Sequence, residues 1–296
     1  MLCYTASMRV DFTNCPLSNI SYSGADKKQG IVFAGANWMI KFAKMGNYGE
    51  INNDVSEYLG SKIFSLLGFH TQEVLLGLYQ GQKVVACKDF MTGKAFTPFS
   101  DVGESSLDGD KHKYIYSYND IVTLINKNKR INDKKEAITL FWKTYIIDAL
   151  LANRDRHGKN WGFIKKNNKY EPAPIFDNGD SLFAAFVDKD ELTYVLENEA
   201  DLLEYVYDTP RSVIKNDEGL NDYYSVISSK KYHECNQAIL SLSPLIEEKL
   251  NEMMLLIDNV DLIEIKKSFL KRIINLRFEL IIKKTYQELL NNERNN

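Results

Sequence analysis

An aspartate and an asparagine stand five residues apart in a polar loop that follows a long apolar segment. The loop reads Asn153-Arg154-Asp155-Arg156-His157-Gly158-Lys159-Asn160, and an apolar run, Trp161-Gly162-Phe163-Ile164, comes directly after it. Loops at the ends of rigid elements often carry catalytic groups. In the D-x-x-x-x-N loop of phosphoryl-transfer sites, the aspartate accepts the proton of the acceptor hydroxyl and the asparagine binds Mg²⁺. The spacing therefore predicts phosphoryl transfer, with Asp155 as the base and Asn160 as a metal ligand.

A second carboxylate follows on what is predicted to be the next hairpin. Asp177 ends the apolar run Ala173-Pro174-Ile175-Phe176 and precedes a turn at Asn178-Gly179. Protein kinases place a Mg²⁺-binding aspartate at this point, because a carboxylate supplies hard oxygen ligands. An ordinary polar turn explains either segment taken alone. The two segments in this order favour a metal site that includes Asp177.

A kinase also needs a lysine that contacts the nucleotide phosphates from a strand. Met39-Ile40-Lys41-Phe42 supplies one in a pattern like V-A-I-K. Taken alone, this lysine is better explained as an edge-strand residue that faces water. Glu57 lies on a predicted helix and is the natural ion-pair partner of Lys41, with a solvated helix position as the alternative. The run Val84–Phe90 leads into the expected hinge, where Phe90 either lines the adenine pocket or belongs to the core.

The first 90 residues are predicted to be rich in β-structure, with one helix over residues 53–67. That helix has apolar residues at helical spacing, Asn53 or Asp54 as its N-cap, and Gly68 as its stop. Two hairpins are expected, one joining residues 30–36 to 38–42 through Gly35-Ala36-Asn37, and one joining 72–79 to 83–90 through Gln80-Gly81-Gln82.

The rest of the chain is predicted to be mostly helical after a loop over residues 91–112, which is rich in Gly, Ser and Asp. The fold class is therefore α+β, a bilobal protein-kinase-like fold with a small β-rich N-lobe (1–92) and a larger helical C-lobe (93–296). Helices are expected over 119–126, 133–153 and several segments between 191 and 290, and short strands over 161–165 and 170–176.

Composition narrows the class of protein further. Of the 296 residues, 44% are hydrophobic and 26% are charged, and the formal net charge is −3. This balance is typical of a globular protein and lacks the basic footprint of a nucleic-acid binder. The four cysteines stand far apart without a CxxC pair, so free thiols are expected instead of a zinc site or disulfides. No signal peptide or membrane-spanning run is predicted.

Three segments, in this order, resemble the HipA-type serine/threonine kinases. Ile20-Ser21-Tyr22-Ser23-Gly24-Ala25-Asp26-Lys27-Lys28 resembles their phosphate loop, I-S-x-x-G-A-Q-x-K. The loop from Asn153 to Asn160 resembles N-x-D-x-H-x-K-N, and Ala173 to Asp177 resembles A-P-L-Y-D. The resemblance covers residues 20 to about 185, and Val84–Phe90 and Asn160–Phe163 are similar to the compact CtkA-type branch of secreted bacterial kinases.

This resemblance implies transfer of a phosphoryl group from ATP, with Mg²⁺, to a protein serine or threonine. It implies Asp155 as catalytic base and Asn160 and Asp177 as Mg²⁺ ligands. Ser21 falls where these kinases phosphorylate themselves, and about two added negative charges there would repel the ATP phosphates. The residues expected near ATP are Ser23, Gly24, Ala25, Asp26, Lys27, Lys28, Lys41, Glu57, Lys88, Phe90, His157 and Lys159.

Several features depart from the family pattern. Asp26 replaces the usual glutamine, and Lys27 makes the phosphate loop more basic. Full-length HipA carries an additional N-terminal subdomain before this loop, whereas this sequence has only a short segment there. We expect a cytoplasmic monomer without nucleic-acid or membrane contact, an antitoxin protein as a candidate partner, and secretion by a signal-less route as an open alternative.

Two alternative functions remain at this point. The same D-R-H-x-x-N core resembles phosphoinositide kinases, but residues 177–208 hold ten acidic residues and one base, Lys189. Such a surface repels an anionic lipid headgroup and favours a neutral or basic acceptor. A nucleotide-binding pseudokinase module is the second alternative. The presence of Lys41, Asp155, Asn160 and Asp177 together favours an active enzyme.

Overall fold

The chain forms two compact units, each described here by itself. The computed structural model describes residues 9–22, 27–91, 93–104, 116–216, 219 and 221–295. The first unit comprises Met1–Gly93, Pro174–Glu197 and Asn251–Lys271, and the second comprises Lys94–Ala173, Asn198–Leu250 and Arg272–Asn296. The first unit therefore combines the β-rich beginning of the chain with two later segments, one of which carries Asp177.

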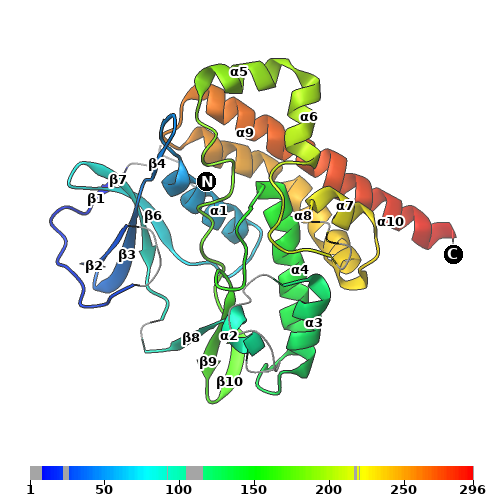
Figure 1. Cartoon of the computed structure of the whole chain (residues 1–296), viewed down its shortest axis with the longest axis horizontal. Coiled ribbons are helices and arrows are strands. Elements are labelled where there is room, and N and C mark those ends of the chain that lie inside the picture. The colour runs from blue at the N-terminus through cyan, green and yellow to red at the C-terminus, as the bar shows by residue number, and fades with distance from the viewer. Residues whose placement is uncertain are drawn as a thin grey trace. The chain divides into compact units, whose positions relative to one another are not determined.

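The first unit contains a five-stranded sheet, whose strands are drawn in blue and cyan in Figure 1. Neighbouring strands are antiparallel, except that β1 runs parallel to β6. A short hairpin, β4 (Met45–Gly46) and β5 (Gly49–Glu50), follows β3. The order across the sheet is β1 (Val10–Asp11), β6 (Val74–Tyr79), β7 (Gln82–Lys88), β3 (Ala36–Phe42) and β2 (Lys28–Phe33).

Both hairpins expected from the sequence are present, with tight two-residue turns. Ala34 and Gly35 have φ of 49° and 74°, and Gln80 and Gly81 have φ of 50° and 76°. Positive φ at both central residues gives a two-residue turn whose twist matches that of the flanking antiparallel strands. The predicted position of the first turn is wrong by one residue, because Ala36 already pairs with Phe33 in the ladder.

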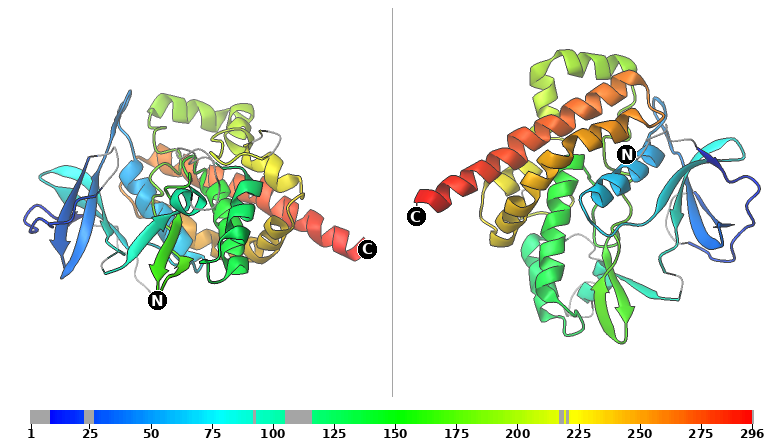
Figure 2. Two further views of the ribbon diagram at one scale, coloured as in Figure 1. Left: turned by 60° about the horizontal axis from the view of Figure 1, so that its bottom comes forward. Right: turned by 180° about the vertical axis from the view of Figure 1, so that it is seen from behind.

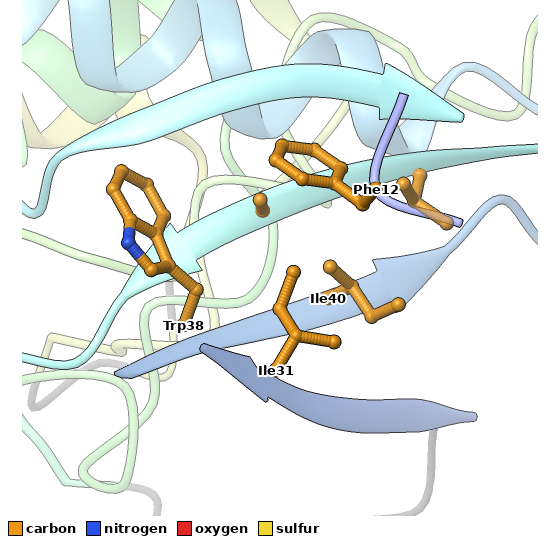
Figure 3. Close-up of a cluster of buried hydrophobic side chains, with 6 residues drawn as sticks. Phe12, Ile31, Trp38 and Ile40 are labelled. Atoms are coloured by element: carbon orange, nitrogen blue, oxygen red, sulfur yellow. The ribbon is translucent and has the colours of Figure 1, made fainter. Parts of the chain in front are cut away.

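The two faces of this sheet bury different side chains. One face holds Phe12, Ile31, Trp38, Ile40, Val84 and Ala86, and Figure 3 shows the first four gathered over the strands. The opposite face buries Val74, Val85 and Cys87 with Met39 and with Tyr58 of helix α1 (Asn53–Leu66). Side chains alternate along a strand, so Lys41 shares the face of Met39. The strand therefore presents Lys41 toward the side of the sheet on which α1 packs.

Helix α1 begins without the predicted side-chain cap. Its N-cap residue is Asn52, whose side chain makes no capping hydrogen bond. The Asn53 side chain instead accepts a hydrogen bond from the Lys44 backbone N–H, and Asp54 forms an ion pair with Arg9 at 2.8 Å. These contacts from outside the helix explain why the local capping prediction was wrong. The predicted stop at Gly68 is confirmed, with φ of 82°.

The second unit contains a three-stranded sheet of β8 (Ala95–Pro98), β9 (Gly162–Lys166) and β10 (Lys169–Pro172). Strand β8 and the short helix α2 (Phe99–Glu104) lie where a loop was predicted, so that prediction is wrong over residues 95–104. The reason is a distant partner. Thr97 pairs with Phe163, and the Phe99 ring stacks on Trp161 with centroids 4.1 Å apart.

Helices make up the rest of the second unit, and α3 packs beside α4 in both views of Figure 2. A capping box at Ser117 and Asp120 starts α3, and Asp133 caps α4. No helix in the described part of the chain is both long and apolar enough to cross a bilayer. The remaining helical segments of the chain are α3 (Tyr118–Lys127), α4 (Lys134–Leu151), α5 (Lys189–Glu197), α6 (Glu199–Tyr207), α7 (Tyr223–Ser228), α8 (His233–Asp258), α9 (Glu264–Arg277), a π-helical turn (Phe278–Lys283) and α10 (Lys284–Asn295).

The cysteines that the structure describes are free thiols, as expected from their spacing. Cys87 and Cys235 are buried, and Cys15 is partly exposed. Burial raises the pKa of the Cys235 thiol to about 12, so this group is uncharged at neutral pH. Cys3 lies outside the described residues.

Candidate active site

The first unit brings Lys41, Glu57 and Asp177 together, and we call these three residues the lysine cluster. The Lys41 ammonium donates to Glu57 Oε2 at 2.9 Å and to Asp177 Oδ1 at 2.6 Å. Lys41 is the last residue but one of β3 and lies opposite Val85 of β7, and Glu57 lies on α1. The Glu57 side chain is only 1% exposed, whereas that of Asp177 is 36% exposed. The more accessible carboxylate is thus the predicted metal ligand.

Electrostatics keep the Lys41 ammonium charged. Burial alone would lower its pKa, but the Glu57 and Asp177 carboxylates outweigh this and hold the pKa well above its ordinary value. Burial raises the pKa of the neighbouring Cys87 thiol, which therefore adds no charge to the cluster. A buried, permanently charged ammonium beside two carboxylates can bind a phosphate oxygen when a nucleotide displaces part of this pairing.

The segment that carries Asp177 is held by backbone pairing within the first unit. Ile175 donates to the His70 carbonyl at 2.8 Å and accepts from the Gln72 N–H at 2.8 Å. The Phe176 ring lies 5.5 Å from that of Phe90. The predicted strand over residues 170–176 is therefore divided: β10 ends at Pro172, and Ile175 pairs elsewhere.

The second unit carries Asp155 and Asn160 in one compact loop. Asn160 Nδ2 donates to the Asp155 carbonyl at 2.8 Å and to Asp155 Oδ2 at 3.1 Å. His157 Nε2 lies 3.7 Å from Asp155 Oδ1. The Asp155 side chain is 40% exposed, while Asn160 is buried. A half-exposed carboxylate is accessible to an acceptor hydroxyl, as a general base requires.

A buried ion pair connects this loop to the end of α4. Arg156 donates to Asp148 through Nε and Nη2, each at 2.9 Å, and Asn153 Nδ2 donates to Asp148 Oδ1 at 2.9 Å. Arg156 Nη1 also donates to the Asn160 carbonyl at 3.3 Å. The two-pronged pairing of guanidinium and carboxylate fixes both position and angle. Asp148 and Arg156 therefore shape the loop that carries the predicted base, Asp155, and the predicted metal ligand, Asn160.

Sequence reasoning did not single out Asp148. It stands near the end of α4 in the run Ile146-Ile147-Asp148-Ala149-Leu150-Leu151, whose other members are all apolar. A lone carboxylate in such a run must be paired when buried, and that was the available signal. Arg277 further secures this end of α4 by donating to the Ala149 carbonyl at 2.5 Å.

The other residues expected near ATP have varied positions. Lys27 donates to Gln82 at 3.1 Å, and Lys88 pairs with Glu73 at 2.7 Å. Lys28 lies opposite Lys41 in the backbone ladder between β2 and β3. Lys159 and Ser21 are exposed. Ser23, Gly24, Ala25 and Asp26 lie outside the described residues, so the centre of the expected phosphate loop remains a prediction.

The donor chemistry fits Mg²⁺ bound together with a nucleotide. In the first unit Asp177 offers a carboxylate, and in the second unit Asn160 offers an amide oxygen. Each by itself is a hard ligand suited to this ion. No group of three or more His, Cys, Asp or Glu side chains in the described part of the chain could hold a metal alone. Nucleotide-bound Mg²⁺ needs no such group, because one or two protein ligands are completed by phosphates and water.

Comparisons with known proteins show the family of this chain. The family model described as HipA-like C-terminal domain matches residues 20–201. The chain is 33% identical over 285 residues to serine/threonine-protein kinase CtkA of Helicobacter pylori strain J99, covering 92% of this chain and 86% of that protein.

Solved structures give the same result at the level of the fold. The crystal structure of the Helicobacter pylori proinflammatory kinase CtkA matches with a TM-score of 0.87 and 31% identity, over 95% of this chain and 98% of that one. HipA from the Shewanella oneidensis MR-1 complex with HipB and operator DNA matches with a TM-score of 0.62 and 16% identity, over 92% of this chain and 67% of that chain. The kinase-like fold class predicted from the sequence is confirmed.

Proposed function

The chain belongs to the HipA-like family and is a serine/threonine-protein kinase; we propose that it uses Mg-ATP and that the lysine cluster and the loop around Asp155 carry the reaction. The observation that supports this most strongly is the contact of one lysine with two carboxylates, Lys41 with Glu57 at 2.9 Å and with Asp177 at 2.6 Å. Kinases require this lysine–glutamate pair and a metal-binding aspartate in place before transfer.

Each residue has a separate task in this proposal. Lys41 holds the nucleotide phosphates, and Glu57 orients Lys41. Asp177 and Asn160 would offer oxygen ligands to Mg²⁺, which would neutralise charge that develops on the phosphates during transfer. Asp155 orients the acceptor hydroxyl and takes its proton, and its hydrogen bonds with Asn160 keep base and metal ligand in fixed relation.

We further propose a neutral or basic protein segment as the acceptor. The ten acidic residues against one base in residues 177–208 support this, since a negative surface attracts a basic partner and repels an anionic lipid. The test offers radiolabelled ATP with either a basic protein or anionic lipid vesicles, with Asp155→Ala as the control. We expect labelling of the protein that requires Asp155. Strong labelling of lipid alone contradicts the proposal.

Ser21 is proposed as a site of self-phosphorylation. It is exposed, and it directly precedes Tyr22, whose hydroxyl donates to Asp89 at 3.5 Å. A phosphate there would add about two negative charges beside the nucleotide phosphates and inhibit the enzyme. Mass spectrometry of the chain after incubation with Mg-ATP is expected to find phosphoserine at position 21 in the wild type and not in Asp155→Ala. A tryptic peptide that stays unmodified in the active enzyme contradicts it.

An antitoxin remains a candidate partner of this chain. The matched Shewanella structure contains HipA together with HipB and operator DNA, and this chain matches the HipA-like C-terminal domain. Co-purification of the tagged chain with proteins from its own cells, followed by mass spectrometry, tests whether such a partner exists. A cytoplasmic location is likewise proposed, and cell fractionation checks it.

A further inference from the structure

Asn178, the residue directly after Asp177, is completely buried although its side chain is polar. Asp177 itself has a left-handed φ of 58°, so the backbone turns sharply between the predicted metal ligand and Asn178. Buried amide groups are almost always hydrogen-bonded, because an unpaired one loses its interactions with water. The partners of Asn178 therefore show which part of the molecule holds this turn.

Two of those partners lie on one face of helix α1. The Asn178 backbone N–H donates to Glu57 Oε1 at 2.9 Å, and its side-chain Nδ2 donates to Ser61 Oγ at 3.2 Å. Glu57 and Ser61 are four residues apart and so lie one turn above the other. The Asn178 carbonyl accepts from Ser181 Oγ at 2.5 Å, which closes the turn on its other side.

The surface of α1 also fits Asn178 sterically. A Cβ atom placed on Gly60 would lie 2.6 Å from Asn178 Cβ and 3.1 Å from Asn178 Cγ. Real Cβ contacts are not this short, so the close approach depends on glycine at position 60. Hydrogen bonding and packing thus independently indicate a specific seat for Asn178 on α1.

With Asn178 in this position, the contacts of the lysine cluster form a closed cycle. Glu57 Oε2 accepts from Lys41 while Glu57 Oε1 accepts from Asn178, and Lys41 also contacts Asp177, the neighbour of Asn178 in the chain. A movement of α1 that displaces Glu57 would therefore also displace the turn that carries Asp177. The positions of Glu57 and of the predicted metal ligand are thus coupled through the buried Asn178.

We propose that Asn178 is a positioning residue that locks α1 to the Asp177 turn and thereby sets the place of the Asp177 carboxylate. This inference rests on the proposed function of Asp177 as a Mg²⁺ ligand. Asn178 acts through Asp177 and Glu57. Its loss should therefore weaken the response of the enzyme to Mg²⁺ and leave the KM for the protein acceptor unchanged.

The test compares four variants of the full chain: Asn178→Ala, Ser61→Ala, the double variant, and Ser65→Ala. Ser65 is exposed on the same helix and is the matched control. Initial rates with labelled ATP and a basic acceptor protein are measured against Mg²⁺ and against acceptor, for variants whose thermal unfolding remains cooperative. Asn178→Ala is expected to raise the Mg²⁺ concentration for half-maximal rate about tenfold or more, since residues that orient metal ligands have effects of this size.

The remaining variants test whether the lock acts as one unit. Ser61→Ala should shift the Mg²⁺ response in the same direction by less, and Ser65→Ala should behave as the wild type. The double variant should match Asn178→Ala, because residues that share one contact are not additive. An unchanged Mg²⁺ response in folded Asn178→Ala, or effects that multiply in the double variant, would overturn the proposal. If Asn178→Ala does not fold, a wild-type Mg²⁺ response in Ser61→Ala overturns it instead.

Failure of the kinase assignment has a different signature. In that case the wild type labels the acceptor no better than Asp155→Ala, whatever the Asn178 variants do. The Mg²⁺ dependence of the rise in Tm with ATP then measures the same coupling without turnover. An Asn178→Ala variant whose Tm responds to Mg²⁺ and ATP as the wild type does still overturns the inference.

Discussion

The lysine cluster and the loop around Asp155 are built in opposite ways. In the cluster, Lys41 contacts residues 16 and 136 positions away in the chain. In the loop, Asn160 contacts Asp155 five positions away, and Arg156 contacts Asp148 eight positions away. The loop therefore takes most of its shape from contacts that are close in the chain, with two further hydrogen bonds from more distant residues. The cluster, in contrast, needs the sheet, α1 and the Asp177 segment of the first unit.

The two regions also divide structure and chemistry differently. In the loop, the buried pair of Asp148 and Arg156 gives the shape, and Asp155 stays 40% exposed. In the cluster, the same carboxylates that hold Lys41 are expected to serve the nucleotide and the metal. Substitutions should thus separate stability from activity in the loop but change both together in the cluster.

The largest effect is expected from Lys41→Met. It removes the proposed phosphate contact and leaves Glu57 buried without its cation, so the rate of phosphoryl transfer should fall about a thousandfold. The measurement is initial rate with labelled ATP, with unfolding monitored in parallel. Lys83→Met is the control on the same sheet, because Lys83 pairs only loosely with Glu50 and Asp261 at 3.4 and 3.7 Å. Wild-type activity of the Lys41→Met variant would contradict the proposed role of the lysine cluster in catalysis.

Asp148→Asn should affect stability first. It removes the charge that pairs with buried Arg156, and loss of one partner of a buried ion pair costs about 3–5 kcal/mol. Urea unfolding measures the loss directly. The double variant Asp148→Leu with Arg156→Met should recover part of it, since no buried charge is then left unpaired. Unfolding of Asp148→Asn at the wild-type urea midpoint contradicts the structural role of this pair.

Glu57→Gln should have a smaller effect on rate than Lys41→Met. Asp177 still contacts Lys41 in this variant, so about a tenfold decrease is expected, the size seen when a supporting hydrogen bond is weakened. Glu50→Gln, in an exposed pair with Lys83, is the control. If Glu57→Gln were as inactive as Lys41→Met while remaining folded, Glu57 would touch the reacting groups directly.

The smallest effect near neutral pH concerns Lys266, which is buried in the first unit and donates to the Phe183 and Phe186 carbonyls at 2.7 and 2.8 Å. Burial lowers its pKa to about 7, from 10.5 in the unfolded chain. Between these values the unfolded state binds a proton that the folded state lacks. Stability should therefore rise with pH from about 7 to 10, by up to about 1.4 kcal/mol per pH unit.

Urea unfolding at pH 7, 8 and 9 measures this slope. Lys266→Met removes the titrating group and should remove the slope attributable to it. Below pH 7 both states of the wild type bind the proton, so the two proteins should show the same pH dependence there. Equal slopes for the two proteins above pH 7 would show that Lys266 stays charged in the folded state.

The contrast between the regions also explains what the sequence could predict. The spacing of Asp155 and Asn160 is a local signal, and so is the turn at Gln80-Gly81. Lys41, Glu57 and Asp177 could be paired only because their order along the chain follows a known pattern; their roles in binding ATP and Mg²⁺ remain predictions. A resemblance thus supplied the long-range information that spacing lacks.

Other features are decided by contacts that are distant in the chain. The seat of Asn178 against Gly60 and Ser61 joins segments 117 positions apart. Strand β8 was taken for a loop because its partner Phe163 is far along the chain. Asn53 and Asp54 have side chains suited to capping, yet they bind the Lys44 backbone N–H and the Arg9 side chain instead. The seat of Asn178 has no local signal, whereas at β8 and at the start of α1 a distant contact overrode the local preference.

Thermal unfolding with and without Mg-ATP, alongside a transfer assay, tests the central division of labour most directly. The proteins compared are the wild type, Asp155→Asn and Asp177→Asn. Because a ligand raises Tm only when it binds the folded state, we expect Mg-ATP to stabilise the wild type and Asp155→Asn alike and to leave Asp177→Asn unchanged, while neither variant transfers phosphate. Transfer at the wild-type rate by Asp155→Asn, or equal stabilisation of Asp177→Asn, would contradict this account.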